Sequence, residues 1–549
     1  MRFLRAAAVL AIAAGLVTGW IYVQPAVDSA TSKLVSATTN SGSGPVTYYI
    51  RPGGNNTAAG TSPAAAWRTL ARASRAVLKP GTRLLLLGGN KYRGTLVIGP
   101  RDAGNVRKPV RIGSYGKGRA KIMSSRNGIM VFDTSGVSIS NLKIRGIHAK
   151  NSSTAGIQMY SSRSKGRLGH VYVTKVDATA FGFGIAIGAV HDGAGFRNVH
   201  VTHSTLHGNL DGGLVTYGPE FNPAVPGYAH ENIYVSRVRV FRNPGDPNNT
   251  VRNTGSGIEL GSVRGATVEN SEAFANGGAN GSTTEGPIGM WAYDSTRIVL
   301  AHDVSHGNKS ANVHDGGGFG LDREVSHSVL EYDLSYDNHG AGLLLYSAPT
   351  APGHQTGNVV RFNISYGDVR GRNHVIGALE AEGKVSNSSL YQNTIVVTGS
   401  NTQPAFKATG DLHHVRVLNN ILIAASGAVA LATEPMSTSA VLFAGNDYLS
   451  SAGTWVVQWG TKTHYDSLAS WRSATGNEEV DGHATGHVVA PMFVGPLSPS
   501  AGGAGFMLRP QSSLVHAGLN LTLRFGIRPG PVTYGGSANL MRSPNIGGQ

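Results

Sequence analysis

From about residue 137 onward, the chain alternates apolar and polar residues over short stretches. Each stretch ends in a turn that contains asparagine, and a second alternating stretch follows. Alternation with a period of two residues is typical of β-strands with one buried face and does not fit a helix. The second stretches start 24 to 44 residues apart, at 156–160, 184–188, 213–217, 257–261, 289–293, 318–322, 342–346 and 378–382, and all but the last begin with glycine.

Asparagines recur just before several of these glycines, at intervals of 34, 33, 32 and 30 residues. They are Asn209, Asn243, Asn276, Asn308 and Asn338, and aromatic residues recur beside them at Phe241, Phe274, Tyr336 and Tyr366. Asparagine tolerates the left-handed backbone region, and its amide can bond to the same residue one layer above. One repeat cannot bury its apolar face alone. The pattern therefore predicts stacked coils, a parallel β-helix with rungs about 4.8 Å apart.

Composition agrees with this all-β interpretation. Glycine supplies 75 of the 549 residues, about twice its usual share of roughly 7%, as tight corners in every coil require. The chain has no cysteine, which excludes disulfides and Cys-ligated metal sites.

Both ends of this region carry further signals. The segments 48–55, 67–73 and 79–86 resemble the entry of right-handed parallel β-helix proteins of the pectin-lyase-like class: a first strand, a capping helix and a first coil. The segments 506–518 and 544–547 resemble the closing segments of such proteins. The resemblance covers about 45–549 and implies a right-handed solenoid with an N-terminal capping helix, from a superfamily of secreted carbohydrate-active proteins. That fold hosts hydrolases, lyases, epimerases and adhesins, so it does not decide the activity.

The first 30 residues read as an export signal, either a cleaved signal peptide or an uncleaved membrane anchor. Arg2 and Arg5 precede an apolar stretch over 6–23, as such signals require. We expect a flexible linker over 31–44, the β-helix over 45–520 and a C-terminal cap or tail over 521–549. The protein is then secreted or extracellular, or held at the membrane by its N-terminal segment.

Charge is distributed unevenly along the chain. The formal balance is +16, but residues 1–150 contain 22 Lys and Arg against 3 Asp and Glu, whereas 251–350 contain 5 against 12. The acidic middle favours a neutral or weakly charged glycan as substrate, because a polyuronate would be repelled there. The basic first third favours an anionic cell-wall or membrane surface as a second partner. No nucleic-acid recognition motif is present, and we expect a monomer.

If the apolar positions of the second stretches point inward, their neighbours form one outward face. That face carries carboxylates among aromatic rings, which suits sugar binding and proton transfer. The candidate catalytic residues are Asp322, paired with Asp294 or Glu259, together with Asp315 and His314. The candidate substrate-binding residues are Trp291, Tyr293, Tyr346, Tyr217, Gly320, Glu380 and Arg323. The glycine run 316–318, with Gly320, is expected to leave a hollow beside the rings.

Three functions fit this face. The first is a glycoside hydrolase, which needs two carboxyl groups about 5–5.5 Å apart for retention or ~6.5–9.5 Å for inversion. It requires no cofactor. The second is a polysaccharide lyase or epimerase that uses Ca²⁺ and a base among Arg264, Arg323, Lys384 and Lys407. The third is a non-catalytic glycan-binding surface protein.

Overall fold

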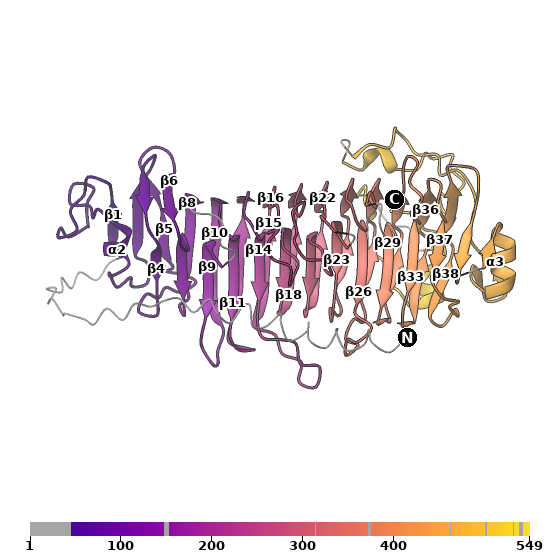
Figure 1. Cartoon of the computed structure of the whole chain (residues 1–549), viewed down its shortest axis with the longest axis horizontal. Coiled ribbons are helices and arrows are strands. Elements are labelled where there is room, and N and C mark those ends of the chain that lie inside the picture. Colours follow the sequence, from indigo (N-terminus) through magenta and orange to yellow (C-terminus); the bar gives the residue numbers. More distant parts are fainter. Residues whose placement is uncertain are drawn as a thin grey trace.

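The computed structural model describes residues 45–147, 153–312, 314–371, 375–461, 463–499, 502–530, 532–536 and 542–548. The expected export signal and linker, 1–44, lie outside these residues. The described chain winds into one elongated stack of parallel coils with short helices near its ends (Figure 1). The predicted all-β solenoid is therefore confirmed. In the described part of the chain, no helix is both long and apolar enough to cross a membrane.

One sheet of 14 strands runs the length of the stack, and we call it the front sheet (Figure 1). Its strands pair in parallel as far as β40, in the order β4 (Leu96–Ile98), β7 (Ile129–Phe132), β9 (Ala155–Ser161), β11 (Phe183–Ala189), β14 (Gly212–Tyr217), β17 (Ser256–Gly261), β20 (Ile288–Tyr293), β23 (Gly317–Leu321), β26 (Leu343–Ser347), β29 (Leu379–Gly383), β33 (Phe406–Thr409), β37 (Ala430–Ala432) and β40 (Val457–Trp459), with β41 (His464–Tyr465) antiparallel at the end.

The remaining coil strands form a second sheet of two columns, joined because two long strands belong to both. The first column is β1 (Thr47–Ile50), β2 (Arg83–Leu87), β5 (Val110–Tyr115), β8 (Val137–Gly146), β10 (Leu168–Thr179), β12 (Phe196–Thr202), β15 (His230–Ser236), β18 (Val263–Glu269), β21 (Thr296–Ala301), β24 (Val329–Glu331), β27 (Val359–Arg361), β31 (Ser389–Tyr391), β35 (Val415–Leu418) and β38 (Val441–Ala444). The second column is β3 (Lys91–Arg93), β6 (Ala120–Ser124), the far halves of β8 and β10, β13 (Thr205–His207), β16 (Arg239–Phe241), β19 (Glu272–Phe274), β22 (Val304–His306), β25 (Leu334–Tyr336), β28 (Ile364–Tyr366), β32 (Thr394–Val396), β36 (Ile421–Ala424) and β39 (Asp447–Ser450). Two further pairs are short, β30 (Val385–Ser386) with β34 (Leu412–His413) and β42 (Glu479–Val480) with β43 (His483–Ala484).

The core lies between these sheets and follows the predicted register. Ile258, Met290, Phe319 and Leu343 are successive register partners in the front sheet, and each is fully buried. Because side chains alternate along a strand, the residues between them face outward. This register creates the face on which the site lies.

The asparagine ladder is present as predicted. Each amide donates to the Oδ1 of the next asparagine along the stack, from Asn209 to Asn243 at 3.1 Å and onward through Asn276 and Asn308 to Asn338. All five are buried, so the ladder satisfies turn groups that would otherwise lack partners. The neighbouring rings also stack, with centroids 4.8 Å apart for Phe241 and Phe274.

Short elements close the ends of the stack. Helix α2 (Leu70–Ala73) packs against β4 at the N-terminal end, and Thr69 caps it by accepting a hydrogen bond from the Arg72 N–H. Helix α3 (Leu468–Thr475) covers the other end with Trp471 fully buried.

The last parallel strand of the front sheet is β40. The chain then returns along the outside of the coils. Its contacts include the Tyr332 hydroxyl with the Val532 carbonyl at 3.0 Å and the Asn419 amide with the Leu519 carbonyl at 2.9 Å. Helix α4 (Leu521–Phe525) and a 3₁₀ turn (Ala504–Phe506) belong to this returning segment.

Candidate active site

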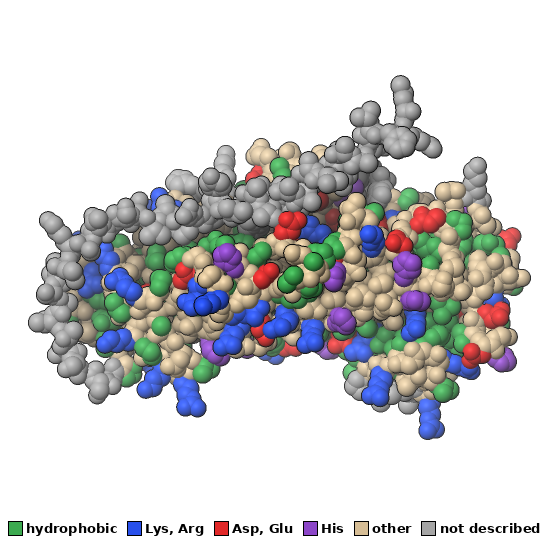
Figure 2. All heavy atoms as spheres, turned by 90° about the horizontal axis from the view of Figure 1, so that it is seen from below, with side chains coloured by type: hydrophobic (Ala, Val, Ile, Leu, Met, Phe, Trp, Pro, Cys, Tyr) green, Lys and Arg blue, Asp and Glu red, His purple; other side chains and the backbone are tan. Residues whose placement is uncertain are grey.

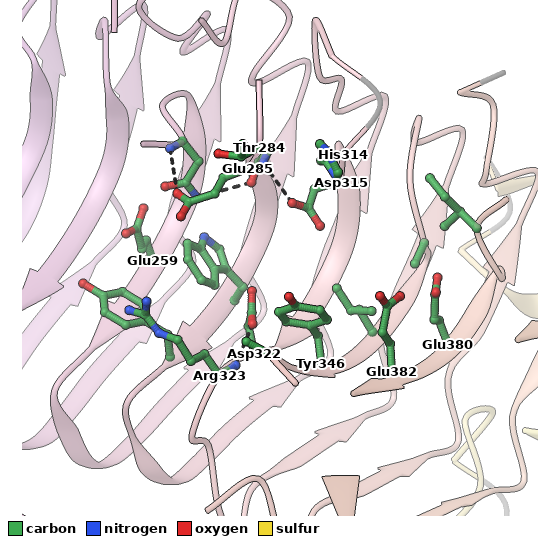
Figure 3. Close-up of a pocket in the computed structure, with 18 of the residues that line it drawn as sticks. Glu259, Thr284, Glu285, His314, Asp315, Asp322, Arg323, Tyr346, Glu380 and Glu382 are labelled. Atoms are coloured by element: carbon green, nitrogen blue, oxygen red, sulfur yellow. Dashed lines mark hydrogen bonds between the residues drawn. The ribbon is translucent and has the colours of Figure 1, made fainter. Parts of the chain in front are cut away.

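A cavity of about 370 Å³ opens on the outward face of the front sheet between β17 and β29. Its floor consists of outward residues of successive strands, namely Glu259 of β17, Trp291 and Tyr293 of β20, Leu344 and Tyr346 of β26, and Glu380 and Glu382 of β29. One wall comes from the turns that precede β17, β20 and β23 (Figure 3). The cavity therefore lies on the face that the alternating pattern predicts.

Hydrogen bonds join the three turns of this wall. The Asn253 N–H donates to Glu285 Oε2 at 3.2 Å, and the Asn253 side-chain amide donates to the Gly286 carbonyl at 3.2 Å. The Gly286 N–H donates in turn to Asp315 Oδ2 at 2.9 Å. These bonds hold Glu285 and Asp315 at the rim of the cavity (Figure 3).

Asp315 and Asp322 flank β23 at its two ends. Asp315 occupies a left-handed turn position with φ 54°, two residues before the strand begins at Gly317. Asp322 directly follows the strand; its N–H donates to the Ala292 carbonyl at 2.9 Å, and its Oδ1 accepts from the Arg323 N–H at 2.6 Å. Both carboxyl groups point into the hollow beside Tyr346 (Figure 3).

Burial raises the pKa of four carboxyl groups in the cavity, including that of Glu380, which rises to about 8 although Lys407 lowers it. It raises the pKa of Asp322 well above its ordinary range, and the charge of Asp315 raises it further. Burial raises the pKa of Asp315 to about 7, against the opposing effect of the Gly286 N–H. Burial raises the pKa of Glu259 to about 8, although Arg252 lowers it. The cavity therefore holds protonated carboxylic acids near neutral pH, as acid catalysis requires.

The aromatic rings lie in the floor of the cavity and are mostly buried. Trp291 is only 7% exposed, and its Nε1–H donates to Ser256 Oγ at 3.0 Å. The Tyr293 ring lies over Gly261, where a Cβ would come within 2.2 Å of it. Tyr346 is half-buried and lies between Asp322 and Glu382 (Figure 3), so of these rings it is the best placed to contact a sugar.

Each cation near the cavity has a carboxylate partner. Arg323 contacts Asp294 at 3.5 Å, and Arg252 contacts Asp211 at 3.0 Å. Lys407 is buried, with its Nζ 2.6 Å from Glu380. Among the residues that the structure describes, no group of three or more His, Asp or Glu side chains is arranged to hold a metal ion.

The structure brings together most of the residues predicted for the site. The cavity is lined by Asp322, Glu259, Asp315, His314, Trp291, Tyr293, Tyr346, Glu380 and Arg323. His314 lies next to Asp315 in the wall, where its N–H donates to Asn312 Oδ1 at 2.7 Å.

Three predicted residues do not line the cavity. Asp294 has a left-handed backbone (φ 44°), is 8% exposed and contacts Arg323, so it is not placed as a partner of Asp322. Tyr217 lies in a separate apolar cluster, where its ring covers Gly188 and its hydroxyl accepts from Gln158. Gly320 lies between Trp291 and Leu344 in register but is not part of the cavity lining.

The glycine run has a different role from the one expected. A Cβ at Gly318 would come within 2.2 Å of Ser335 Oγ, and one at Gly317 within 2.6 Å of the Ala341 carbonyl. Gly316 has φ 76°. These three glycines therefore allow a turn and close packing between coils, and do not form the hollow.

Comparison with protein-family models gives no match, and comparison with curated proteins gives none either. Among solved structures, a GH136 lacto-N-biosidase from Eubacterium ramulus matches with TM-score 0.50 and 16% identity over 68% of this chain and 63% of that chain. Its selenomethionine form matches with TM-score 0.50 and 14% identity over 81% and 68%. The chain has a right-handed parallel β-helix fold. A pectate lyase, Pel9A, is 17% identical over 92% of this chain and 96% of that chain, with TM-score 0.42. At these identities the likeness shows the fold alone.

Several cavity residues lie outside the alternating pattern of this β-helix. Glu285 and Thr284 lie in the turn before β20, and Arg252 and Asn253 lie in the turn before β17. The strand alternation carries no signal for turn residues. A search for polar residues just before the glycine of each second stretch would have found them.

Proposed function

We propose that the protein is a glycan-active enzyme and, more specifically, a glycoside hydrolase that uses Asp322 and Asp315 as its carboxyl pair. The observation that carries this proposal is that one cavity receives both carboxyl groups from the two ends of β23. Glycoside hydrolysis requires two carboxyl groups on either side of the scissile bond.

The surroundings of the two carboxyl groups indicate which one is the general acid and which is the nucleophile or base. Asp322 has a pKa raised well above its ordinary range, partly because of Asp315, so Asp322 is the general acid. Asp315 has a pKa raised to about 7 and accepts the Gly286 N–H, which favours its ionised form, and its charge in turn raises the pKa of Asp322. Asp315 is therefore the nucleophile or base. Two carboxyl groups with separated pKa values commonly divide the acid and base roles in this way.

The reaction follows from these roles. Asp322 donates its proton to the glycosidic oxygen, and the bond between that oxygen and the anomeric carbon breaks. Asp315 either attacks the anomeric carbon, to be released by water, or removes a proton from the water that attacks it. Glu259, whose pKa is raised to about 8, stays protonated and donates a hydrogen bond to a sugar hydroxyl.

The charge of the site supports a neutral glycan as substrate. Six carboxyl groups line the cavity, from Glu259, Glu285, Asp315, Asp322, Glu380 and Glu382, and only two arginines do. A polyuronate would be repelled by those of the six that are ionised, among them Asp315 when it acts as nucleophile or base.

The cations proposed for a lyase are engaged elsewhere. Arg264 contacts Glu231 at 3.2 Å, and the Lys384 ammonium donates to the Ala351 carbonyl at 2.8 Å. Arg323 and Lys407 contact carboxylates. An arginine or lysine base for proton abstraction would first have to leave these partners, which favours hydrolysis.

The test is a panel of neutral polysaccharides and oligosaccharides, read by reducing-end release and by ultraviolet absorbance. Asp322→Asn and Asp315→Asn should each lose at least a hundredfold in kcat, and Asp411→Asn, an exposed carboxylate outside the cavity, should retain full activity. Full activity in both cavity variants would overturn the carboxyl pair. Binding of a glycan without turnover would overturn the enzymatic proposal in favour of a binding protein.

A further inference from the structure

The first coils carry like charges in register on the outside of the second sheet. Lys91, Lys121 and Lys143 are successive partners in β3, β6 and β8. Two residues further along the same strands, Arg93 and Arg145 lie one rung either side of Met123. In the first column, Arg83 of β2 is the partner of Arg111 of β5. We call these seven cations, Lys91, Lys121, Lys143, Arg93, Arg145, Arg83 and Arg111, the basic strip.

In later coils, the same register positions carry ion pairs or stacked rings. Arg239 contacts Glu272 on the next rung at 2.6 Å, and His207 contacts Asp177 at 3.2 Å. Phe241 and Phe274 stack, continuing the column that contains Arg93. Like charges directly opposite one another in a sheet are destabilising, whereas opposite charges and stacked rings are favourable. The fold therefore does not require the basic strip, and the strip opposes folding.

Acidic residues are nearly absent around the strip. Residues 45–147 contain 18 Lys and Arg and 2 Asp and Glu. Asp102 is buried and accepts hydrogen bonds from the Leu78 and Gly99 N–H groups, and Asp133 accepts from Ser162. Within the described ranges, no strip residue forms an ion pair within 4.0 Å. Lys and Arg side chains (blue) also predominate at the N-terminal end of the face in Figure 2.

The geometry of the strip defines its ligand. Lys91, Lys121 and Lys143 form a row along the stack at the rung spacing of about 4.8 Å. This spacing matches a linear chain that carries a charge on each unit. Tyr92, between Lys91 and Arg93, points inward and is 4% exposed. Tyr92 therefore offers no exposed ring of the kind that single-stranded nucleic-acid sites use to stack bases.

We propose that the basic strip binds a linear acidic polysaccharide with a uronate on each residue, lying along the axis of the β-helix. The strip lies on the second sheet and the cavity on the front sheet, so polymer bound to the strip leaves the cavity open. The strip tethers the protein to acidic polymer while the cavity acts on a neutral glycan. Asp177, the register partner of Lys143, ends the strip.

The test is binding to immobilised polygalacturonate, with the fully methyl-esterified polymer as the uncharged matched ligand. We expect the Lys121→Glu/Arg111→Glu double variant to bind at least tenfold more weakly, with a smaller dependence on salt. It should fold, because each substitution creates the alternating charges seen at Arg239 and Glu272. Arg237→Glu, an exposed charge reversal outside the strip, should bind like the unmodified protein.

Three results would overturn the proposal. These are unchanged binding in the double variant, equal binding of the esterified polymer, or tighter binding of single-stranded DNA than of polygalacturonate. Binding to the basic strip can also be tested independently of the proposed hydrolase activity. The double variant should keep full turnover of a small neutral glycan, and Asp322→Asn should keep full binding to polygalacturonate.

Discussion

A second ladder inside the solenoid has two neighbouring carboxylic acids, Asp303 and Asp333, followed by rungs of asparagine from Asn363 to Asn446. Its side chains accept backbone N–H groups from one coil to the next, from Asp303 to Asp333 at 2.8 Å and from Asp333 to Asn363 at 2.9 Å. In the asparagine rungs, the amide also donates to the next Oδ1, as Asn363 does to Asn393 at 3.0 Å. The Oδ2 atoms of Asp303 and Asp333 occupy the place of that amide, are buried and have no hydrogen-bond partner.

Protonation of Asp303 and Asp333 gives each unpartnered Oδ2 a hydrogen to donate, as the side-chain amide of an asparagine rung does. Burial raises the pKa of both groups well above the ordinary range, and Glu269 near Asp303 and Glu331 near Asp333 act in the same direction. A carboxyl group whose pKa is raised by folding stabilises the fold fully below its unfolded pKa, and this contribution is lost as the pH rises through its folded pKa.

We therefore predict that Asp303→Asn/Asp333→Asn makes stability less dependent on pH. At pH values between its unfolded-state and folded-state pKa, each acid lowers the free energy of unfolding by up to about 1.4 kcal/mol for every pH unit. At pH 4 the variant and the unmodified protein should differ by no more than about 1 kcal/mol per site, the net value of one hydrogen bond. At pH 8 the variant should be clearly the more stable.

The assay is thermal unfolding followed by circular dichroism at pH 4 and pH 8, at one ionic strength. The difference in melting temperature between the variant and the unmodified protein should grow with pH. Asn363→Asp, which adds a third acid to the ladder, should steepen the pH dependence. A difference in melting temperature that is the same at both pH values would show that Asp303 and Asp333 are not protonated in the folded protein.

Three further predictions concern the cavity. The rate should rise with pH through about 7 as Asp315 ionises and fall at higher pH as Asp322 loses its proton; initial rates across pH give the profile, and a rate independent of pH would contradict it. Gly261→Ala places a Cβ 2.2 Å from the Tyr293 ring, so KM should rise roughly tenfold, about 1.4 kcal/mol, with kcat nearly unchanged. Lys407→Met removes the cation 2.6 Å from Glu380 and should lower the free energy of unfolding by about 3–5 kcal/mol. Thermal unfolding measures this loss, and adding Glu380→Gln should restore part of the stability.

The fold was predictable because strand alternation and buried asparagines repeat in the sequence as they do in space. Alternation at Ile258 and Met290 sets the register of the front sheet and thereby places Glu259 and Tyr346 on one face. The second ladder was equally regular, with 30 residues between Asp303, Asp333 and Asn363. It was missed because it mixes two residue types.

The site was only partly predictable because alternation fails where a strand ends. Asp294 directly follows β20, and its left-handed backbone breaks the alternation, leaving the carboxyl group against Arg323. Tyr217 does alternate correctly, but its ring leans toward Gly188, away from the cavity. Glu285 lies in a turn whose position depends on hydrogen bonds to other turns, and no local pattern encodes these.

Asp322 and Asp315 are proposed to hydrolyse a glycosidic bond in this cavity. Mass spectrometry of products formed in ¹⁸O-labelled water tests it most directly, because hydrolysis adds one water molecule for each bond cleaved. We predict one ¹⁸O atom per cleavage, with no such product from Asp322→Asn. An unsaturated product that gains no oxygen from water would contradict the account.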